Sequence, residues 1–394
     1  MNKILTFTKE GPAKSLLFFA VYFVINLLFL TKYGIRQSLI PLSILVVGFL
    51  VVHLFLFLLR KNQLLQKRIN VKLVYLLTVL FTVVYIALCH ILKDPYKMNI
   101  DRWQTLNFSL EYWTHGKYIY DTPNFMGNLS SYLPGQLLLA LPSYLLGNVG
   151  YLQVMAFLLF SYTIILEFKS NLIRFTAILM LGISLSYIYE AVCKSDFISS
   201  FILVAAFILF WHSKFKDNYF QKPVLLGIGL GVLCLTRSVA AIPIIIFLLN
   251  PFLATSNRNK IKTGLFFLLT VAVLLFTVFL PAKNFDFIIH HNPLILQGQS
   301  NQFVMLVLLA VAFILAFNVK KINDVFYFST CIVFLIMLSF VIEKYLVLGF
   351  GFQHNLFSTT YLASCLPFSI VAYCFSVRGE IEKGTTVINV LIER

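Results

Sequence analysis

The chain has 394 residues, of which 60% belong to the set AVILMFWYC and only 12% are charged, and its mean hydropathy is +0.88. A soluble globular protein averages about 45–50% apolar and about 25% charged residues, so the composition excludes an ordinary water-soluble fold. The net charge of +16 would suggest a nucleic-acid partner in a soluble protein. In a membrane protein, the basic residues of the loops instead set the orientation of the chain in the bilayer. We therefore expect an all-α integral membrane protein without a nucleic-acid partner.

Apolar stretches of about 20 residues, the length that a spanning helix needs, follow one another along most of the chain. The first stretch has no small-residue cleavage site and is expected to remain as a helix. We expect a polytopic helical bundle of about 12 spans, with a range of about 10 to 13, that forms a single transmembrane domain over residues 1–394. The expected spans are 15–39, 39–59, 71–92, 149–168, 172–193, 197–213, 223–236, 239–254, 264–281, 303–319, 325–343 and 354–377.

Two apolar stretches have unusual lengths. The stretch 223–254 is too long for one span and carries Arg237 in its middle and Pro243 just after, which predicts two short helices that meet near the outer face. The stretch 136–147 is only about a dozen residues long and lies between Pro134 and a glycine. This length is typical of an interfacial or re-entrant helix.

The basic residues predict the orientation. With the N-terminus inside, roughly two thirds of the 31 basic residues fall on the cytoplasmic side. We therefore expect a multi-pass protein of the cell membrane, surrounded by membrane lipids, with both termini cytoplasmic. A bacterial plasma membrane is favoured because the chain is rich in Phe, Lys, Ile and Asn and poor in Arg. Two outer loops follow from this orientation, one at 93–148 with short amphipathic, interfacial helices inside it and one at 283–302.

The longest polar segment covers residues 93–135 in the first outer loop. Loops longer than about 12–15 residues are usually functional. Apolar positions between Ile100 and Tyr112 recur at helical spacing, which predicts an amphipathic helix on the membrane with Asp101 at its start. Trp103 and Trp113, in the same segment, are typical of interfacial anchors or of residues that stack on sugars.

Several pieces of this segment occur in a recognisable order. An acid at the start of the outer loop is followed by the amphipathic stretch, by HGKYIY and by SYLPGQLLLALP, and LTRSVAAIP follows later in the chain. Together they cover about a fifth of the sequence and resemble the lipid-dependent GT-C glycosyltransferases. The matching positions of the outer loop are Asp101, Gly116, Tyr120, Tyr132 and Pro134.

The resemblance implies a function. It makes Asp101 the catalytic base, a polyprenyl-phosphate-linked sugar the donor, and a glycan or a lipid-linked molecule the acceptor. It also implies an active site that opens to the non-cytoplasmic side and serves assembly of the cell envelope. The chain departs from the family because the loop follows the third expected helix and because Asp101 has no acidic neighbour closer than Asp94. No metal ligands are predicted, and a divalent cofactor, Mg²⁺ or Mn²⁺, is left open.

One acid suits this chemistry. A lipid phosphate departs without much protonation, so the enzyme needs a base for the acceptor hydroxyl and cations for the phosphate. Arg237 is the first candidate for the phosphate because its planar fork suits phosphate oxygens and it lies at an expected helix break. The other phosphate-binding candidates are Lys194, His291 and His354. The substrate-binding candidates are Arg102, Trp103, Tyr120, Tyr132 and Gln299.

Simpler roles and other functions stay open. Asp101 could only cap its helix, and Arg237 could snorkel to the interface or pair with Glu190 or Asp196. Lys194 and Asp196 could form a solvated pair. The alternative functions are a flippase for lipid-linked oligosaccharides or another polytopic transporter, and a polysaccharide polymerase. Transporters usually contain interrupted helices at corresponding positions of two repeats. The sequence shows one such interruption, near Arg237, and no matching one in the other half.

Overall fold

The computed structural model describes residues 12–37, 39–59, 68–97, 100–297, 301–348 and 359–392. Within these ranges the chain is helical, and the only β pairing is an isolated bridge between Pro123 and Leu129. The expectation of an all-α fold is confirmed.

The helices follow the apolar stretches of the sequence closely. Each of the twelve expected stretches overlaps a helix, and the stretch 172–193 overlaps two. The α-helices are α1 (Pro12–Arg36), α2 (Leu42–Leu59), α4 (Val71–Ile91), α5 (Arg102–Thr114), α6 (Pro134–Leu145), α7 (Tyr151–Glu167), α8 (Asn171–Gly182), α9 (Leu185–Cys193), α10 (Phe197–Phe215), α11 (Pro223–Cys234), α12 (Ala241–Ala254), α13 (Asn257–Phe279), α14 (Phe285–His290), α15 (Gln302–Phe317), α16 (Ile322–Leu348) and α18 (Leu366–Ile392). Short 3₁₀ helices are η1 (Pro95–Lys97), η2 (Ser238–Ala240), η3 (Pro293–Gln297) and η4 (Thr360–Cys365).

The expected count of about 12 spans is not confirmed. Among the described residues, seven helices are long and apolar enough to cross a membrane, or eight if α8 and α9, bent by 51° at their junction, form one span. The other apolar helices have only 10–17 residues. At 1.5 Å per residue they reach about 15–26 Å, less than the hydrocarbon core of about 30 Å. The hydropathy of the sequence locates the apolar segments but does not show where a helix within them bends or ends. The long helices support a membrane-embedded helical protein.

The bundle has inner and outer helices. The spanning window of η4 and α18 is 89% buried and that of α10 is 67% buried, whereas those of α4 and α13 are only 11% and 17% buried. The outer helices expose large aliphatic side chains such as Leu76 and Val79 of α4 and Leu268 of α13. Such rows of exposed apolar residues are stable against lipid tails but not against water.

Glycines bring α11 and α13 together. A Cβ at Gly227 would lie 2.6 Å from the carbonyl oxygen of Thr263, and a Cβ at Gly231 would lie 2.7 Å from the Cβ of Thr270. The four-residue spacing places both glycines on one face of α11, as the small-xxx-small pattern of membrane helices requires. The Gly227-x-Gly229-x-Gly231 run therefore serves packing and not nucleotide binding.

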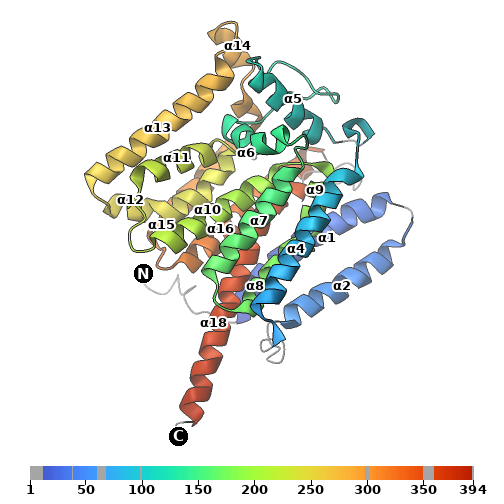
Figure 1. Cartoon of the computed structure of the whole chain (residues 1–394), viewed down its shortest axis with the longest axis vertical. Helices are drawn as coiled ribbons and strands as arrows, with labels where there is room; N and C mark the ends of the chain where they lie inside the picture. Colours follow the sequence, from blue (N-terminus) through green and yellow to red (C-terminus); the bar gives the residue numbers. More distant parts are fainter. Residues whose placement is uncertain are drawn as a thin grey trace.

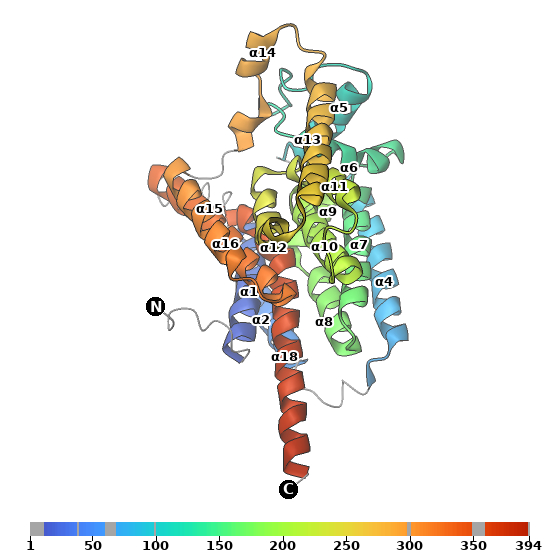
Figure 2. The same cartoon turned by 90° about the vertical axis from the view of Figure 1, so that its left-hand side faces the viewer.

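Short helices and loops collect at one end of the bundle. In Figures 1 and 2, α5, α6 and α14 lie at the end opposite to the projecting C-terminal part of α18. The break between α11 and α12 and the connection from α9 to α10 belong to this end as well, because Arg237 and Lys194 line cavities together with residues of α5. We call the segments 93–148, 194–196, 235–240 and 283–297 the loop end.

The orientation can be tested by labelling. Lys117 at the loop end and Asp217 in the turn after α10 are both exposed, and the positive-inside argument places the first outside and the second inside. We expect a cysteine in place of Lys117 to react with an impermeant maleimide in outer-permeabilised cells, and a cysteine in place of Asp217 to react only after lysis. The unmodified chain is the control, since its six cysteines are buried or half-buried. The reverse labelling would place the loop end in the cytoplasm.

Candidate functional site

Asp101 lies at the start of α5, as the helical spacing predicted, but its carboxylate does not cap the helix. Oδ2 accepts hydrogen bonds from Nδ2 of Asn124 and from Nδ2 of Asn128, both at 2.8 Å. Oδ1 accepts none from the described residues. The two amides fix the orientation of the carboxylate and leave one oxygen available. Capping alone therefore does not explain this acid.

The turn at residues 124–128 is itself held in place. Oδ1 of Asn124 accepts hydrogen bonds from the backbone N–H groups of Met126 and Asn128, both at 3.0 Å, and the backbone N–H of Asn124 donates to the carbonyl of Asn128. Gly127 supplies the positive φ of 80° that the turn needs. Nδ2 of Asn124 also donates to Oγ1 of Thr105 on α5. These bonds position both amides before any ligand binds.

Asp101 and Arg237 line the same cavity, although 136 positions separate them along the chain. The cavity has a volume of about 400 Å³, within the range of about 300–1,000 Å³ that small-molecule sites occupy. We call it the Asp101 cavity. Its lining residues are Ile100, Asp101, Arg102, Thr105, Asn124, Met126, Asn128, Leu129, Ser131, Tyr132, Arg237, Leu296 and Tyr361.

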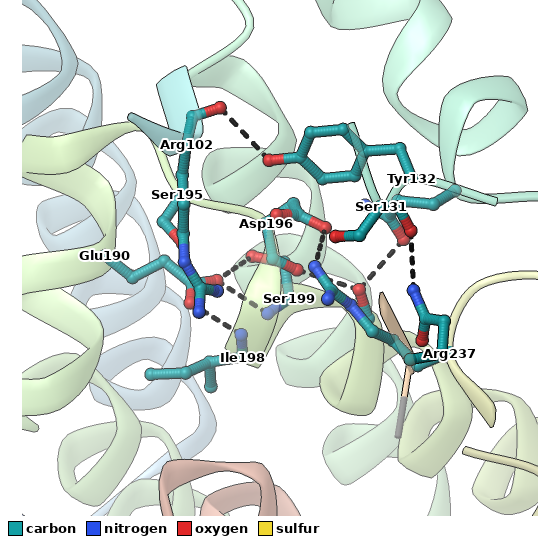
Figure 3. A network of polar contacts seen from close by, with 12 residues as sticks. Arg102, Ser131, Tyr132, Glu190, Ser195, Asp196, Ile198, Ser199 and Arg237 are labelled. Carbon is teal, nitrogen blue, oxygen red and sulfur yellow. Dashed lines mark hydrogen bonds and ion pairs between the residues drawn. The ribbon is translucent and has the colours of Figure 1, made fainter. Parts of the chain in front are cut away.

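Arg237 lies in the break between α11 and η2 and pairs with Asp196 rather than with Glu190 (Figure 3). Its Nη2 lies 2.7 Å from Oδ2 of Asp196, whose side chain is fully buried. The guanidinium also lies over the ring of Phe197, at 5.3 Å, and over that of Tyr132, at 5.8 Å. An arginine held by a buried carboxylate and two rings does not snorkel to an interface. It is a fixed cation in the wall of the Asp101 cavity.

The neighbouring sequence candidates take different places. The guanidinium of Arg102 lies over the rings of Phe197 and Tyr361, at 5.1 and 5.6 Å, and makes no hydrogen bond or ion pair with a described residue. The hydroxyl of Tyr132 donates to the backbone carbonyl of Arg102 at 3.0 Å, and the hydroxyl of Tyr120 donates to the carbonyl of Tyr132 at 2.9 Å. Arg102 and Tyr132 line the cavity, and Tyr120 lies behind Tyr132 as a buried support.

The other candidates do not join the Asp101 cavity. Trp103 and Lys194 line a second cavity that borders α5. His291 follows the last residue of α14, and its carbonyl accepts a hydrogen bond from the hydroxyl of Tyr118 at 2.7 Å. Gln299 and His354 lie outside the described residues.

Sequence reasoning missed several residues of this site. The two asparagines that hold Asp101 belong to a turn around Gly127, and only that turn signal could have drawn attention to them. Gln297, close to the predicted Gln299, donates from Nε2 to the carbonyl of Ser131 at 2.6 Å and so brings η3 to the cavity rim.

Glu190 caps α10 from a neighbouring helix (Figure 3). Its buried carboxylate accepts hydrogen bonds from the backbone N–H groups of Ile198 and Ser199, at 2.5 and 2.7 Å, and from the hydroxyl of Ser199 at 2.8 Å. Asp196, the residue directly before α10, makes no side-chain capping bond. Because Glu190 satisfies the first N–H groups of α10, Asp196 stays available for Arg237.

Replacement of Glu190 is expected to reduce stability. Glu190→Ala would leave two buried backbone donors without an acceptor, which costs about 1–3 kcal/mol for each such group, so the midpoint of thermal unfolding in detergent should fall by several degrees. Glu190→Gln should lower the unfolding midpoint less, since the amide oxygen of glutamine still accepts one of the hydrogen bonds. Glu111→Ala, at an exposed position of α5, is the control and should leave the midpoint unchanged. An unchanged midpoint for Glu190→Ala would contradict the capping role.

α6 begins against the end of α11. A Cβ at Gly135 would lie only 2.1 Å from the carbonyl oxygen of Val232, so no larger residue fits without a shift of the backbone. The backbone N–H of Gln136 donates to the carbonyl of Leu235 at 3.2 Å. The start of α6, just after Tyr132, is thereby joined to the break that carries Arg237.

The described residues contain no group of three or more His, Cys, Asp or Glu side chains arranged to hold a metal ion. Comparisons of the chain with models of protein families, with curated proteins and with solved structures find no match. The Asp101 cavity and the residues that resemble the GT-C pattern are therefore the features of the chain that bear on its function.

Proposed function

We propose that the chain is a membrane glycosyltransferase of the GT-C type, which moves a sugar from a polyprenyl-phosphate donor to an acceptor hydroxyl on the non-cytoplasmic side during assembly of surface glycans. One observation carries the proposal: a single oriented carboxylate, Asp101, shares a cavity of about 400 Å³ with the guanidinium groups of Arg102 and Arg237. Asp101 and Tyr132 are also positions of the family resemblance.

The arrangement supplies both parts that the reaction needs. Oδ1 of Asp101 accepts the proton of the acceptor hydroxyl while the acceptor oxygen bonds to the anomeric carbon of the donor sugar. The bond between that carbon and the phosphate oxygen breaks, and its electron pair leaves with the polyprenyl phosphate. Cations placed beforehand stabilise the negative charge that develops on the phosphate.

The two arginines differ in what they can give to the phosphate. One nitrogen of the Arg237 guanidinium, Nη2, already pairs with Asp196, and the side chain is therefore fixed in position. Arg102 is held only by aromatic rings, so its N–H groups are available to phosphate oxygens. We assign Arg237 to a fixed positive field and Arg102 to direct hydrogen bonds with the donor phosphate.

A transporter is the second candidate, because the helices are interrupted at two places. Besides the break around Arg237, α8 and α9 meet at an angle of 51°. Buried polar groups lie at that bend, where Oδ1 of Asn26 accepts hydrogen bonds from the hydroxyl of Ser184 at 2.8 Å and from the backbone N–H of Ser186 at 3.2 Å. Interrupted helices with polar groups are a feature of transporters.

One assay separates the two functions. The purified chain in liposomes is supplied with polyprenyl-phosphate hexoses and pentoses that carry a radiolabel in the sugar, together with glycans and lipids extracted from bacterial envelopes. A glycosyltransferase releases free polyprenyl phosphate and moves the label to an acceptor. A flippase moves the intact donor across the bilayer and releases no phosphate. Translocation without release across the whole donor set would reject the proposed activity.

A further inference from the structure

A second cavity borders α5 at positions other than those that line the Asp101 cavity. It has a volume of about 350 Å³ and receives the side chains at positions 103, 104, 107, 108 and 111, whereas the Asp101 cavity receives those at 101, 102 and 105. We call it the Lys194 cavity. Its lining residues are Pro95, Tyr96, Trp103, Gln104, Asn107, Phe108, Glu111, Gly147, Asn148, Val149 and Lys194.

Lys194 is an unusual residue for the wall of a cavity. Its side chain is only 6% exposed, and its Nζ lies 3.6 Å from the centre of the Trp103 ring. The ammonium makes no hydrogen bond and no ion pair with the described residues, although it has three donors. Burial lowers the pKa of this amine. The lysine is largely buried, but its unpaired ammonium still reaches the cavity, so an anionic group in the cavity would supply its counter-charge.

The backbone at Lys194 supports the same conclusion. Lys194 has φ 49° and is the one non-glycine residue with positive φ among those that the structure describes. This conformation is unfavourable for a side chain with a Cβ and persists where its surroundings require it. Here it ends α9 and turns the lysine toward Trp103, so the position of the ammonium is set by the fold.

Apart from Glu111, the one acid in the lining, the remaining lining residues are uncharged, and several of them suit a sugar. Trp103 and Phe108 offer aromatic rings, and the C–H faces of a pyranose pack on such surfaces. Asn107 and Nε2 of Gln104 offer amide groups that make no hydrogen bond with the described residues and can bond to sugar hydroxyls, whereas the amide of Asn148 is bonded to Cys89 and Gly150. An apolar ligand would leave these amides unpaired, so a polyhydroxylated ligand is favoured.

We propose that the Lys194 cavity is a second ligand site, which binds an acidic saccharide, that is, a sugar that carries a carboxylate or a phosphate, with its anionic group on Lys194. Binding itself follows from the cavity alone. The further statement that this saccharide is part of the acceptor glycan rests on the proposed glycosyltransferase function.

A hydrogen bond connects the two cavities. Oε1 of Gln104, which lines the Lys194 cavity, accepts from the backbone N–H of Phe125 at 3.3 Å. Phe125 follows Asn124, whose amide holds the carboxylate of Asp101. Positions 101 and 104 are also one helical turn apart, about 5 Å along the axis of α5. A glycan bound beside Gln104 therefore lies close to the turn that orients the base.

Binding is tested with the full chain in detergent. The probes are a trisaccharide of galacturonate, a trisaccharide of galactose that carries one phosphate, and the neutral galactose trisaccharide, each titrated by calorimetry and by tryptophan fluorescence. We expect at least one acidic probe to bind with at least tenfold lower Kd than the neutral one. Lys194→Asn removes the ammonium and suits the backbone conformation, and it should abolish this preference. Lys117→Asn, at an exposed lysine of the loop end, is the matched control and should keep it.

Two results would overturn the inference. One is the absence of any preference for the acidic probes, including the absence of all binding, in a protein with a normal unfolding midpoint. The other is an unchanged preference in Lys194→Asn. Asp101→Asn should bind the acidic probes as the unmodified chain does, because Asp101 lies outside this cavity. Binding without sugar transfer would reject only the glycosyltransferase proposal, and transfer without binding would reject only the second site.

Discussion

Asp101→Asn is expected to reduce sugar transfer by about 10²–10⁴-fold, the usual contribution of a well-placed general base. Asparagine has nearly the same size, and its amide oxygen can still accept the hydrogen bonds that Asn124 and Asn128 donate to Oδ2. The turn and α5 should therefore keep their positions, and only the capacity to accept a proton is lost. The initial rate of label transfer and the midpoint of thermal unfolding are measured together.

The controls separate catalysis from local structure. Asp121→Asn changes an exposed acid of the same loop, whose carboxylate accepts a hydrogen bond from the hydroxyl of Thr122 and from no other described side chain, and should keep full transfer. An Asp101→Asn protein that retains more than about a tenth of the rate would remove Asp101 from the role of base. Asp94 and Glu111 would then be the next acids to test.

Arg237→Ala is expected to abolish transfer and to lower stability strongly. Asp196 is fully buried, and removal of its arginine leaves a buried carboxylate without a counter-charge. Breaking a buried pair in this way costs about 3–5 kcal/mol. Arg237→Lys keeps the charge but not the planar fork, so it should recover most of the stability and only part of the transfer. Thermal midpoints in detergent and the apparent KM for the donor are the measurements.

A double variant distinguishes the two effects of Arg237. When Asp196→Asn is combined with Arg237→Ala, neither charge is left in the wall, so the unfolding midpoint should rise above that of Arg237→Ala alone. Transfer should stay low, because the positive field at the donor phosphate is still missing. A stable double variant with full transfer would show that Arg237 serves only to neutralise Asp196.

The elements that could be predicted from the sequence are those specified by local pattern. The helical spacing after Ile100 predicted α5 with Asp101 at its start, and the structure confirms both. The arginine and the proline within 223–254 predicted two helices, which α11 and α12 confirm. The short run 136–147 predicted the helix α6, which covers twelve residues. Periodicity and helix-breaking residues act over a few neighbours, so a single sequence is sufficient for them.

The features of the site that the sequence did not predict depend on side chains that come together only in the folded chain. Lys194 and Asp196 are two residues apart and could form a solvated pair by sequence, yet Lys194 lines one cavity and Asp196 holds the arginine of the other. The positive φ of Lys194 turns the chain between them. The sequence Cys-Lys-Ser-Asp contains no glycine or asparagine that would predict this turn. Asn124 and Asn128, whose amides hold Asp101, follow it by 23 and 27 positions, so no local pattern connects them to it.

The close approach at Gly135 has a consequence for how a ligand enters and leaves. Because the start of α6 and the end of α11 touch through their backbones, we expect the wall that carries Tyr132 and Arg237 to move as one unit. The opposite wall is different, since the turn at 124–128 is attached to α5 through side-chain hydrogen bonds that can break one at a time. We expect this turn to open and close while its counterpart stays still, so the lifetime of the turn, rather than the width of the helix bundle, would set how fast a bulky product escapes.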